Sequence, residues 1–86
     1  MTFRSLALPR FWDLYERLPA EIQAQADKPF ALFSKNPSDP SLRFKQVRPF
    51  WSVRVSYSYR ALAVRNGEEL TWFWIGTHAD YDELLA

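Results

Sequence analysis

The chain has 86 residues, of which 48% are apolar and 17% aromatic, and its formal net charge is +1. This length predicts a single domain over residues 1–86 with a core large enough to fold without cross-links. The absence of cysteine excludes disulfides and thiolate metal sites. No signal peptide or membrane-spanning run is apparent near the N-terminus, so we expect a soluble, cytoplasmic protein with no membrane partner.

The charges are unevenly distributed along the chain. Residues 1–41 carry five basic and five acidic side chains, whereas residues 42–65 carry six basic ones and no acid. Residues 66–86 carry five acids and no lysine or arginine. Because the basic block coincides with predicted strands, its charge is held on a rigid surface that suits a polyanion.

The first 35 residues predict a strand followed by two helices. Residues 2–8 alternate as a strand does, and Pro9 is favoured in the first turn of a helix. Apolar side chains then recur at helical spacing over residues 10–18. Pro19 ends that helix and starts a second over residues 20–33, in which Pro29 predicts a kink or a break.

After a loop over residues 34–41, the apolar period changes to two. Four strand candidates follow, over residues 42–47, 49–57, 59–65 and 68–76. Asn66-Gly67 predicts a two-residue type I′ hairpin. Residues 78–86 predict a short final helix whose acids lie near the positive end of the helix dipole.

The hairpin loop fixes which side chains of its two strands share a face. With Asn66 and Gly67 in the loop, one face pairs small with large side chains and suits a core under helices. The predicted pairs on this face are Arg65–Glu68, Ala63–Leu70, Ala61–Trp72 and Tyr59–Trp74. The predicted pairs on the other face are Val64–Glu69, Leu62–Thr71 and Arg60–Phe73.

The preceding strand adds a second arginine to the polar face. For the apolar residues 51, 53 and 55 to reach the core face, the loop near Tyr57 must have an odd number of residues. A three-residue loop sets Arg54 opposite Arg60, although facing like charges destabilise a sheet by roughly 0.2–1 kcal/mol. An anion between the two guanidinium groups would account for the pair. Arg43 and Lys45 alternate on the next strand and extend this basic face.

Two alternatives remain open for this face. Arg54 and Arg60 either bind an anion or pair with Glu69, Asp80 or Asp82 and only keep the face soluble. The face also carries Phe50, Leu62, Val64, Phe73 and Ile75, which is too apolar to be fully solvated. We therefore expect the last helix or a partner to cover part of it.

The single histidine, His78, follows the last strand candidate. No metal-ligand spacing surrounds it, and no Ser-His-Asp or Cys-His arrangement is apparent, so a metal site is not expected. Its place near Arg60 suggests another role. Cleaving a phosphodiester without a metal needs cations at the phosphate and a proton donor that acts near neutral pH. In RNA the 2′-hydroxyl can be the nucleophile, and Tyr81 can stack on an unpaired base.

The order of these segments resembles the RelE/ParE superfamily of bacterial type II toxin–antitoxin toxins. The carrying residues are FWSVRVSYSYRALAV, the Asn-Gly hairpin and WFWIGTHADYDELL. The segment FWDLYERLPAEIQAQADKPFALF, followed by NPSDPSLRFKQV, is similar to the two-helix opening of these toxins. The resemblance implies an α+β fold of order β-α-α-β-β-β-α, with two helices on one face of an antiparallel sheet and an RNA-binding groove on the other.

The resemblance also implies a function. In the mRNA-cleaving members, basic residues match Arg54 and Arg60, an aromatic residue matches Tyr81, and a histidine-bearing type would make His78 the general acid. The implied activity is cofactor-independent and metal-independent cleavage of mRNA, usually on the ribosome, by a toxin that a cognate antitoxin wraps and blocks. The predicted RNA-binding residues are Arg43, Lys45, Arg48 and Ser52.

Two other functions are compatible with the same fold. A ParE-like toxin inhibits DNA gyrase and needs no histidine, and a degenerate member binds only its antitoxin and their operator complex. Ser52 stands where the RelE type has a second lysine, and no residue is an obvious general base.

Overall fold

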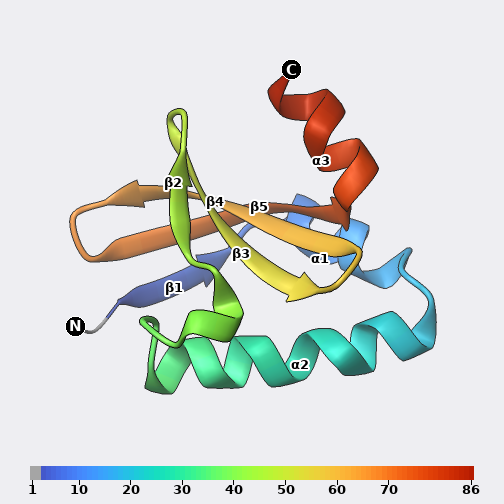
Figure 1. Ribbon diagram of the computed structural model, residues 1–86, viewed down its shortest axis with the longest axis horizontal. Helices are drawn as coiled ribbons and strands as arrows, with labels where there is room; N and C mark the ends of the chain where they lie inside the picture. Colours follow the sequence, from blue (N-terminus) through green and yellow to red (C-terminus); the bar gives the residue numbers. More distant parts are fainter. Residues whose placement is uncertain (1–2) are drawn as a thin grey trace.

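The chain begins with a strand that belongs to the sheet, followed by two helices that lie on one face of that sheet (Figure 1). In the computed structural model, which describes residues 3–86, β1 (Arg4–Ala7) is followed by α1 (Pro9–Glu16) and α2 (Ala20–Lys35). Pro9 lies in the first turn of α1, and Pro19 is the N-cap of α2. α2 continues through Pro29, so a break there is excluded. Ala26 and Phe33, on either side of Pro29, are both buried and hold the helix against the sheet.

The remaining chain forms a short helix, four strands and a final helix. These are the 3₁₀ helix η1 (Pro40–Leu42), β2 (Lys45–Val47), β3 (Phe50–Ser56), β4 (Tyr59–Asn66), β5 (Glu69–Thr77) and α3 (His78–Leu85). The α+β fold and all four later strand candidates are confirmed. The short β2 is additional to the order β-α-α-β-β-β-α.

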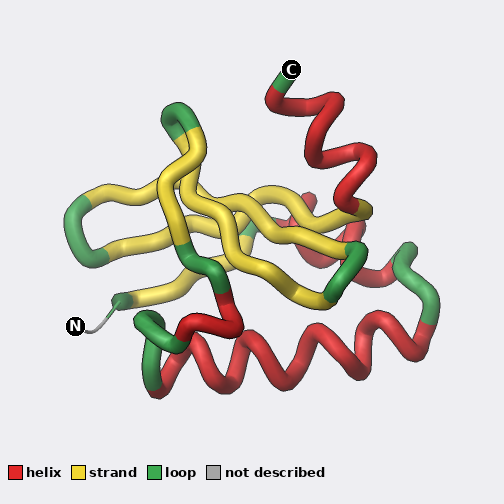
Figure 2. The backbone as a smooth tube through the Cα atoms, in the orientation of Figure 1, coloured by secondary structure: helices red, strands yellow, loops and turns green. Residues whose placement is uncertain are grey.

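The sheet has the strand order β1-β5-β4-β3-β2. Three of its strand pairs are antiparallel, but β1 runs parallel to β5, so the sheet is mixed rather than wholly antiparallel. The two strands come from opposite ends of the chain, and alternation within each strand does not reveal their relative direction. Figure 2 shows the resulting arrangement, with the β3–β4 turn and the start of α3 at the same end of the sheet.

The β4–β5 hairpin uses different loop residues from those predicted. Gly67 and Glu68 form the turn, and Asn66 pairs with Glu69. Of the two turn residues, Gly67 alone has a positive φ, +64°, which fits a type II′ turn with glycine first. The predicted type I′ turn is therefore wrong. The observed pairs nearest the turn are Arg65–Leu70, Val64–Thr71 and Ala63–Trp72, in place of Arg65–Glu68, Val64–Glu69 and Ala63–Leu70.

A β-bulge at Phe73 then changes which side chains face the core. Ala63 pairs with Trp72 and Leu62 with Trp74, which leaves Phe73 as the extra residue. Beyond the bulge, Ile75 joins the core, although it was predicted on the other face. The predicted pairs Ala61–Trp72, Tyr59–Trp74, Leu62–Thr71 and Arg60–Phe73 are wrong. The observed partners are Ile75 for Ala61, Thr77 for Tyr59, Trp74 for Leu62 and Gly76 for Arg60.

The connection between β3 and β4 places the side chains of β3 on the predicted faces, although its turn differs from the predicted loop. Tyr57 and Ser58 form a two-residue turn, not a three-residue loop, and the register shifts between Arg54 and Ser56. The extra residue lies in the strand as a bulge. Arg54 consequently lies opposite Arg60, as predicted.

The core lies between the sheet and the pair α1 and α2. Its buried side chains come from both helices and from the strands beneath them. Phe33 lies near the middle of this core, and the centre of its ring is 4.9 Å from that of Phe44 and 5.6 Å from that of Trp72. α1 and α2 are joined by the Tyr15 hydroxyl, which donates to Asp27 Oδ1 at 2.9 Å. Burial and this hydrogen bond raise the pKa of Tyr15.

The opposite face of the sheet is partly covered by α3 (Figure 1). Tyr81 of α3 is 7% exposed and Leu62 beneath this layer is fully buried, which confirms that the last helix covers part of this face. Phe50 and Phe73 pack against each other there, with ring centres 5.0 Å apart. Within residues 3–86, no helix is long and apolar enough to cross a membrane.

Candidate functional site

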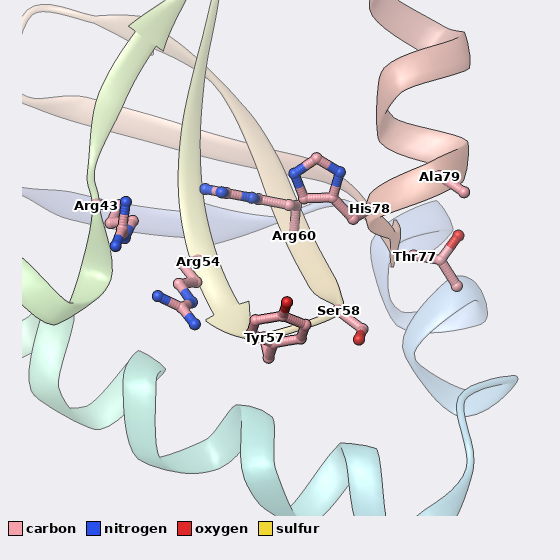
Figure 3. A pocket seen from close by; sticks show the side chains of 8 residues that line it. All are labelled: Arg43, Arg54, Tyr57, Ser58, Arg60, Thr77, His78 and Ala79. Atoms are coloured by element: carbon pink, nitrogen blue, oxygen red, sulfur yellow. The ribbon is translucent and has the colours of Figure 1, made fainter.

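A cavity of about 640 Å³ opens where the β3–β4 turn meets the start of α3 (Figure 3). We call it the arginine cavity, because Arg43, Arg54 and Arg60 line it from the η1–β2 connection, β3 and β4. Its other lining residues are Tyr57, Ser58, Thr77, His78 and Ala79. The turn and the helix are joined directly, since the His78 N–H donates to the Ser58 carbonyl at 2.7 Å.

The two strand arginines have no carboxylate partner among the described residues. The ion pairs within residues 3–86 are Arg4–Glu69 and His78–Asp82. Neither Arg54 nor Arg60 takes part in them, which rules out the alternative that they are neutralised by acidic side chains. In addition, Arg60 Nη1 is buried without a hydrogen-bond partner in this part of the chain. Two facing guanidinium groups without counter-ions form a site suited to an anion.

Aromatic rings hold both guanidinium groups in place. The Arg54 guanidinium lies 5.8 Å from the Tyr57 ring centre, and that of Arg60 lies 5.6 Å from the Tyr81 ring centre. Such cation–π contacts restrict long side chains without neutralising their charge. Gly76, opposite Arg60, is in close contact with the Trp74 ring, since a Cβ there would lie 2.6 Å from it.

The first turn of α3 adds to the positive potential of the cavity. Thr77 is the N-cap, and its hydroxyl accepts the Asp80 N–H at 3.1 Å. Thr77, and not one of the acids of this turn, therefore caps the helix. Thr77, His78 and Ala79 all line the cavity, so the positive end of the α3 dipole lies beside the arginines.

His78 has a carboxylate partner that was not predicted from the sequence. Its Nδ1 lies 3.1 Å from Asp82 Oδ2, one helical turn further on. The His78 side chain is 44% exposed, so its ring is held by Asp82 and still reaches the cavity. The i, i+4 spacing of a histidine and an aspartate on a predicted helix is the signal that could have revealed this pair.

The remaining predicted residues lie outside the cavity. Tyr81 contacts both the Arg60 guanidinium and the His78 ring, the latter at 5.5 Å between centres, but it does not line the cavity. Lys45 is exposed and pairs with Ser52, which is fully buried with its hydroxyl unpartnered among the described residues. Arg48 lies in the β2–β3 turn, at the far end of β3 and roughly 20 Å from the β3–β4 turn.

Among residues 3–86, no group of three or more histidine, aspartate or glutamate side chains is placed to hold a metal ion.

Tyr57 and Ser58 also form part of the site and were not predicted. Nothing in the local pattern distinguishes them from ordinary turn residues, because their role depends on the contact between this turn and α3.

Solved toxin structures resemble this chain over nearly its whole length. YafQ from E. coli superposes with a TM-score of 0.71 at 10% identity and covers 93% of this chain and 98% of its own. The YoeB/ParE toxin from Agrobacterium tumefaciens gives 0.65 at 16% identity, with 88% and 99% covered. The RelB–RelE antitoxin–toxin complex from Methanococcus jannaschii gives 0.68 at 13% identity, with 94% and 99% covered. These identities show a shared fold.

The sequence itself matches a family model. No curated protein matches the sequence, but residues 20–83 match the family described as ParE-like toxin domain. This match spans α2, the whole antiparallel part of the sheet and most of α3, including the arginine cavity. The chain therefore belongs to the ParE-like toxin domain family, within the RelE/ParE superfamily of toxins of toxin–antitoxin systems.

Proposed function

We propose that this toxin is a metal-independent endoribonuclease that cleaves mRNA on the ribosome. The observation that carries the proposal is the facing pair Arg54 and Arg60, free of carboxylate partners and adjacent to the His78–Asp82 pair. Two cations and a proton donor around one cavity are what a phosphodiester needs when it is cleaved without a metal.

In the proposed reaction, the scissile phosphate binds between the arginines at the start of α3. The 2′-oxygen of the preceding ribose attacks phosphorus, and its proton leaves to solvent or to a phosphate oxygen. The bond from phosphorus to the 5′-oxygen breaks as His78 donates a proton to that oxygen. The products are a 2′,3′-cyclic phosphate and a 5′-hydroxyl. Arg54 and Arg60 stabilise the additional negative charge on phosphorus in the transition state.

Asp82 would act as a positioning residue in this reaction. By accepting the Nδ1 hydrogen of His78, it leaves Nε2 as the ring nitrogen that carries the transferred proton. It also limits rotation of a side chain that is otherwise nearly half exposed. Tyr81 supports the same geometry from beneath, because its ring contacts both His78 and the Arg60 guanidinium.

We further propose that an antitoxin covers this site. The similar chain in the Methanococcus jannaschii structure is in complex with an antitoxin. Here the open face combines unpaired arginines with Phe50, Phe73 and the exposed Val64. An antitoxin with acidic and apolar side chains would complement both parts and exclude RNA.

The direct test is cleavage of mRNA by purified toxin on ribosomes in their magnesium buffer, and metal independence is tested with free RNA at high toxin concentration in EDTA. We expect the parent to cleave, and His78→Ala and Arg60→Ala to lose activity by at least a hundredfold, since each removes a group that acts on the transition state. Arg10→Ala, an exposed arginine on α1, is the matched control and should cleave like the parent. Full activity of both site variants on the ribosome, or loss of the cleavage of free RNA when EDTA is added, would contradict the proposal.

The family match favours one other candidate function, inhibition of DNA gyrase by a ParE-like toxin. This activity needs neither RNA nor a proton donor. If mRNA remains intact while the toxin blocks supercoiling by purified gyrase, the second function is correct. A chain that does neither and still binds an antitoxin would be a degenerate member.

A further inference from the structure

A second cavity adjoins the first on the helical side of β3. It has a volume of about 600 Å³ and lies between α2 and β3, so we call it the α2–β3 cavity. Arg54 and Tyr57 line both cavities. A ligand group held in one cavity is therefore next to whatever occupies the other.

The α2–β3 cavity has an apolar interior. Leu42 and Val55 are almost fully buried, and Pro29 and Leu32 are half-buried along α2. The rest of the lining is polar or basic and contains no carboxylate side chain. An apolar slot with a polar, cationic rim suits a flat aromatic group attached to an anionic backbone.

The boundary between the cavities is a stacking platform. Tyr57 is 87% exposed, and the Arg54 guanidinium lies 5.8 Å from the centre of its ring. An exposed aromatic ring in a tight turn is costly to solvate and contributes nothing to this core. Aromatic rings and guanidinium planes are the surfaces on which unpaired bases stack.

Pro29 removes one helical hydrogen-bond donor from the part of α2 that lines the same cavity. Proline has no N–H, so the carbonyl of Gln25, four residues earlier in α2, lacks its helical donor. Both residues line the α2–β3 cavity. A free carbonyl accepts from an exocyclic amino group, which adenine, cytosine and guanine carry and uracil lacks.

We infer that the α2–β3 cavity binds an unpaired nucleobase adjacent to the phosphate in the arginine cavity, and that it favours bases with an exocyclic amino group. This inference rests on the proposed function, because the phosphate defines which base is adjacent. Tyr57 and Arg54 stack on the base, and the Gln25 carbonyl reads its edge.

The first test measures binding of a short single-stranded RNA whose 2′-hydroxyls are methylated, so that it is not cleaved. Fluorescence anisotropy is compared for Tyr57→Ala and for Trp12→Ala, an exposed aromatic residue on α1 outside both cavities. We expect Tyr57→Ala to weaken binding roughly tenfold, in line with one lost stacking contact, and Trp12→Ala to bind like the parent. An abasic nucleotide at one position should weaken the parent similarly and leave Tyr57→Ala unaffected.

The second test uses Pro29→Ala, which restores the N–H of α2 and should fold at least as well as the parent. At the position found with the abasic strand, the parent should prefer adenine to purine without its amino group by roughly two- to tenfold. In Pro29→Ala this preference should disappear while Tyr57-dependent stacking remains.

The outcomes separate this inference from the proposed function. If Arg60→Ala does not weaken binding of the RNA, the proposed function fails and the base site fails with it. If binding depends on Arg60 but the abasic and Tyr57→Ala effects simply add at every position, the cavity does not hold a base. An unchanged adenine preference in Pro29→Ala would contradict the role of the Gln25 carbonyl.

Discussion

At the scale of single residues, the site depends on charges that other residues leave unpaired. The chain has ten carboxylates, and the two that form ion pairs in the described part of the chain have partners other than Arg54 and Arg60. Glu69 pairs with Arg4 across the β1–β5 edge, and Asp82 pairs with His78. Arg54 and Arg60 consequently keep their full charge beside the cavity, held by aromatic rings instead of acids.

Asp82 provides the residue-scale prediction. Asp82→Asn keeps the size of the side chain but offers an amide N–H as readily as a carbonyl to Nδ1, so the ring loses its fixed tautomer. We expect kcat for RNA cleavage to fall by about tenfold or more while KM changes little, because proton transfer and not binding is affected. The ¹⁵N shifts of the His78 ring should show a matching change in tautomer population.

A control on the same helix separates this effect from helix stability. Glu83→Gln removes a neighbouring exposed acid that has no ion-pair partner in the described part of the chain. It should leave both the kinetics and the His78 spectrum unchanged. If Asp82→Asn also leaves kcat and the ring shifts unchanged, Asp82 has no positioning role.

At the scale of elements, the type and order of strands and helices follow from periodicity, but their exact frames do not. Alternation places all four later strands, and proline positions predict where both early helices begin. Two bulges and a shifted turn lie outside what alternation reveals. The bulge at Phe73 moves Trp74 out of the core face and Ile75 into it, because one extra residue reverses every side chain beyond it.

The prediction that Arg54 lies opposite Arg60 was correct although the predicted loop length was wrong, and the reason is physical. Its prediction depended on the parity required to bury Val53 and Val55, not on the turn itself. The observed turn has two residues, and a strand bulge supplies the third. The His78–Asp82 pair and the role of Tyr57 were missed, since they depend on how α3 and the β3–β4 turn meet.

The β4–β5 turn gives the element-scale prediction. In the observed frame Gly67 carries the positive φ, and a Cβ there meets no atom within 4 Å, so Gly67→Ala costs only conformational strain. We expect it to lower the free energy of unfolding by about 1 kcal/mol, measured by urea denaturation. Asn66→Ala should change stability by less than about 0.5 kcal/mol, because a type II′ turn makes no demand on that residue. A larger loss in Asn66→Ala than in Gly67→Ala would support the type I′ frame instead.

At the scale of the whole molecule, the fold brings basic side chains that are separated in the sequence to one part of the surface. The net charge is only +1, yet Arg43, Arg54 and Arg60 meet at one end of the sheet, while four of the five acids of residues 66–86 lie on β5 and α3. Lys45 shares the site face through its pairing with Ser52, whereas Arg48 lies at the opposite end of β3. Composition predicts the surplus of positive charge in residues 42–65, and only the register determines which charges act together.

The salt dependence of RNA binding tests this convergence. For a single strand, each phosphate contact contributes about −0.7 to the slope of log K against log salt concentration, so contacts by Arg43, Arg54 and Arg60 predict a slope near −2. Arg43→Ala and Arg54→Ala should each reduce its magnitude by about 0.7, as measured by anisotropy between roughly 50 and 200 mM salt. Arg48→Ala removes the same charge from the distant turn and should leave the slope unchanged. If Arg48→Ala flattens the response as much as Arg54→Ala does, the positive charge acts diffusely over the molecule and the arginine cavity is not a defined phosphate site.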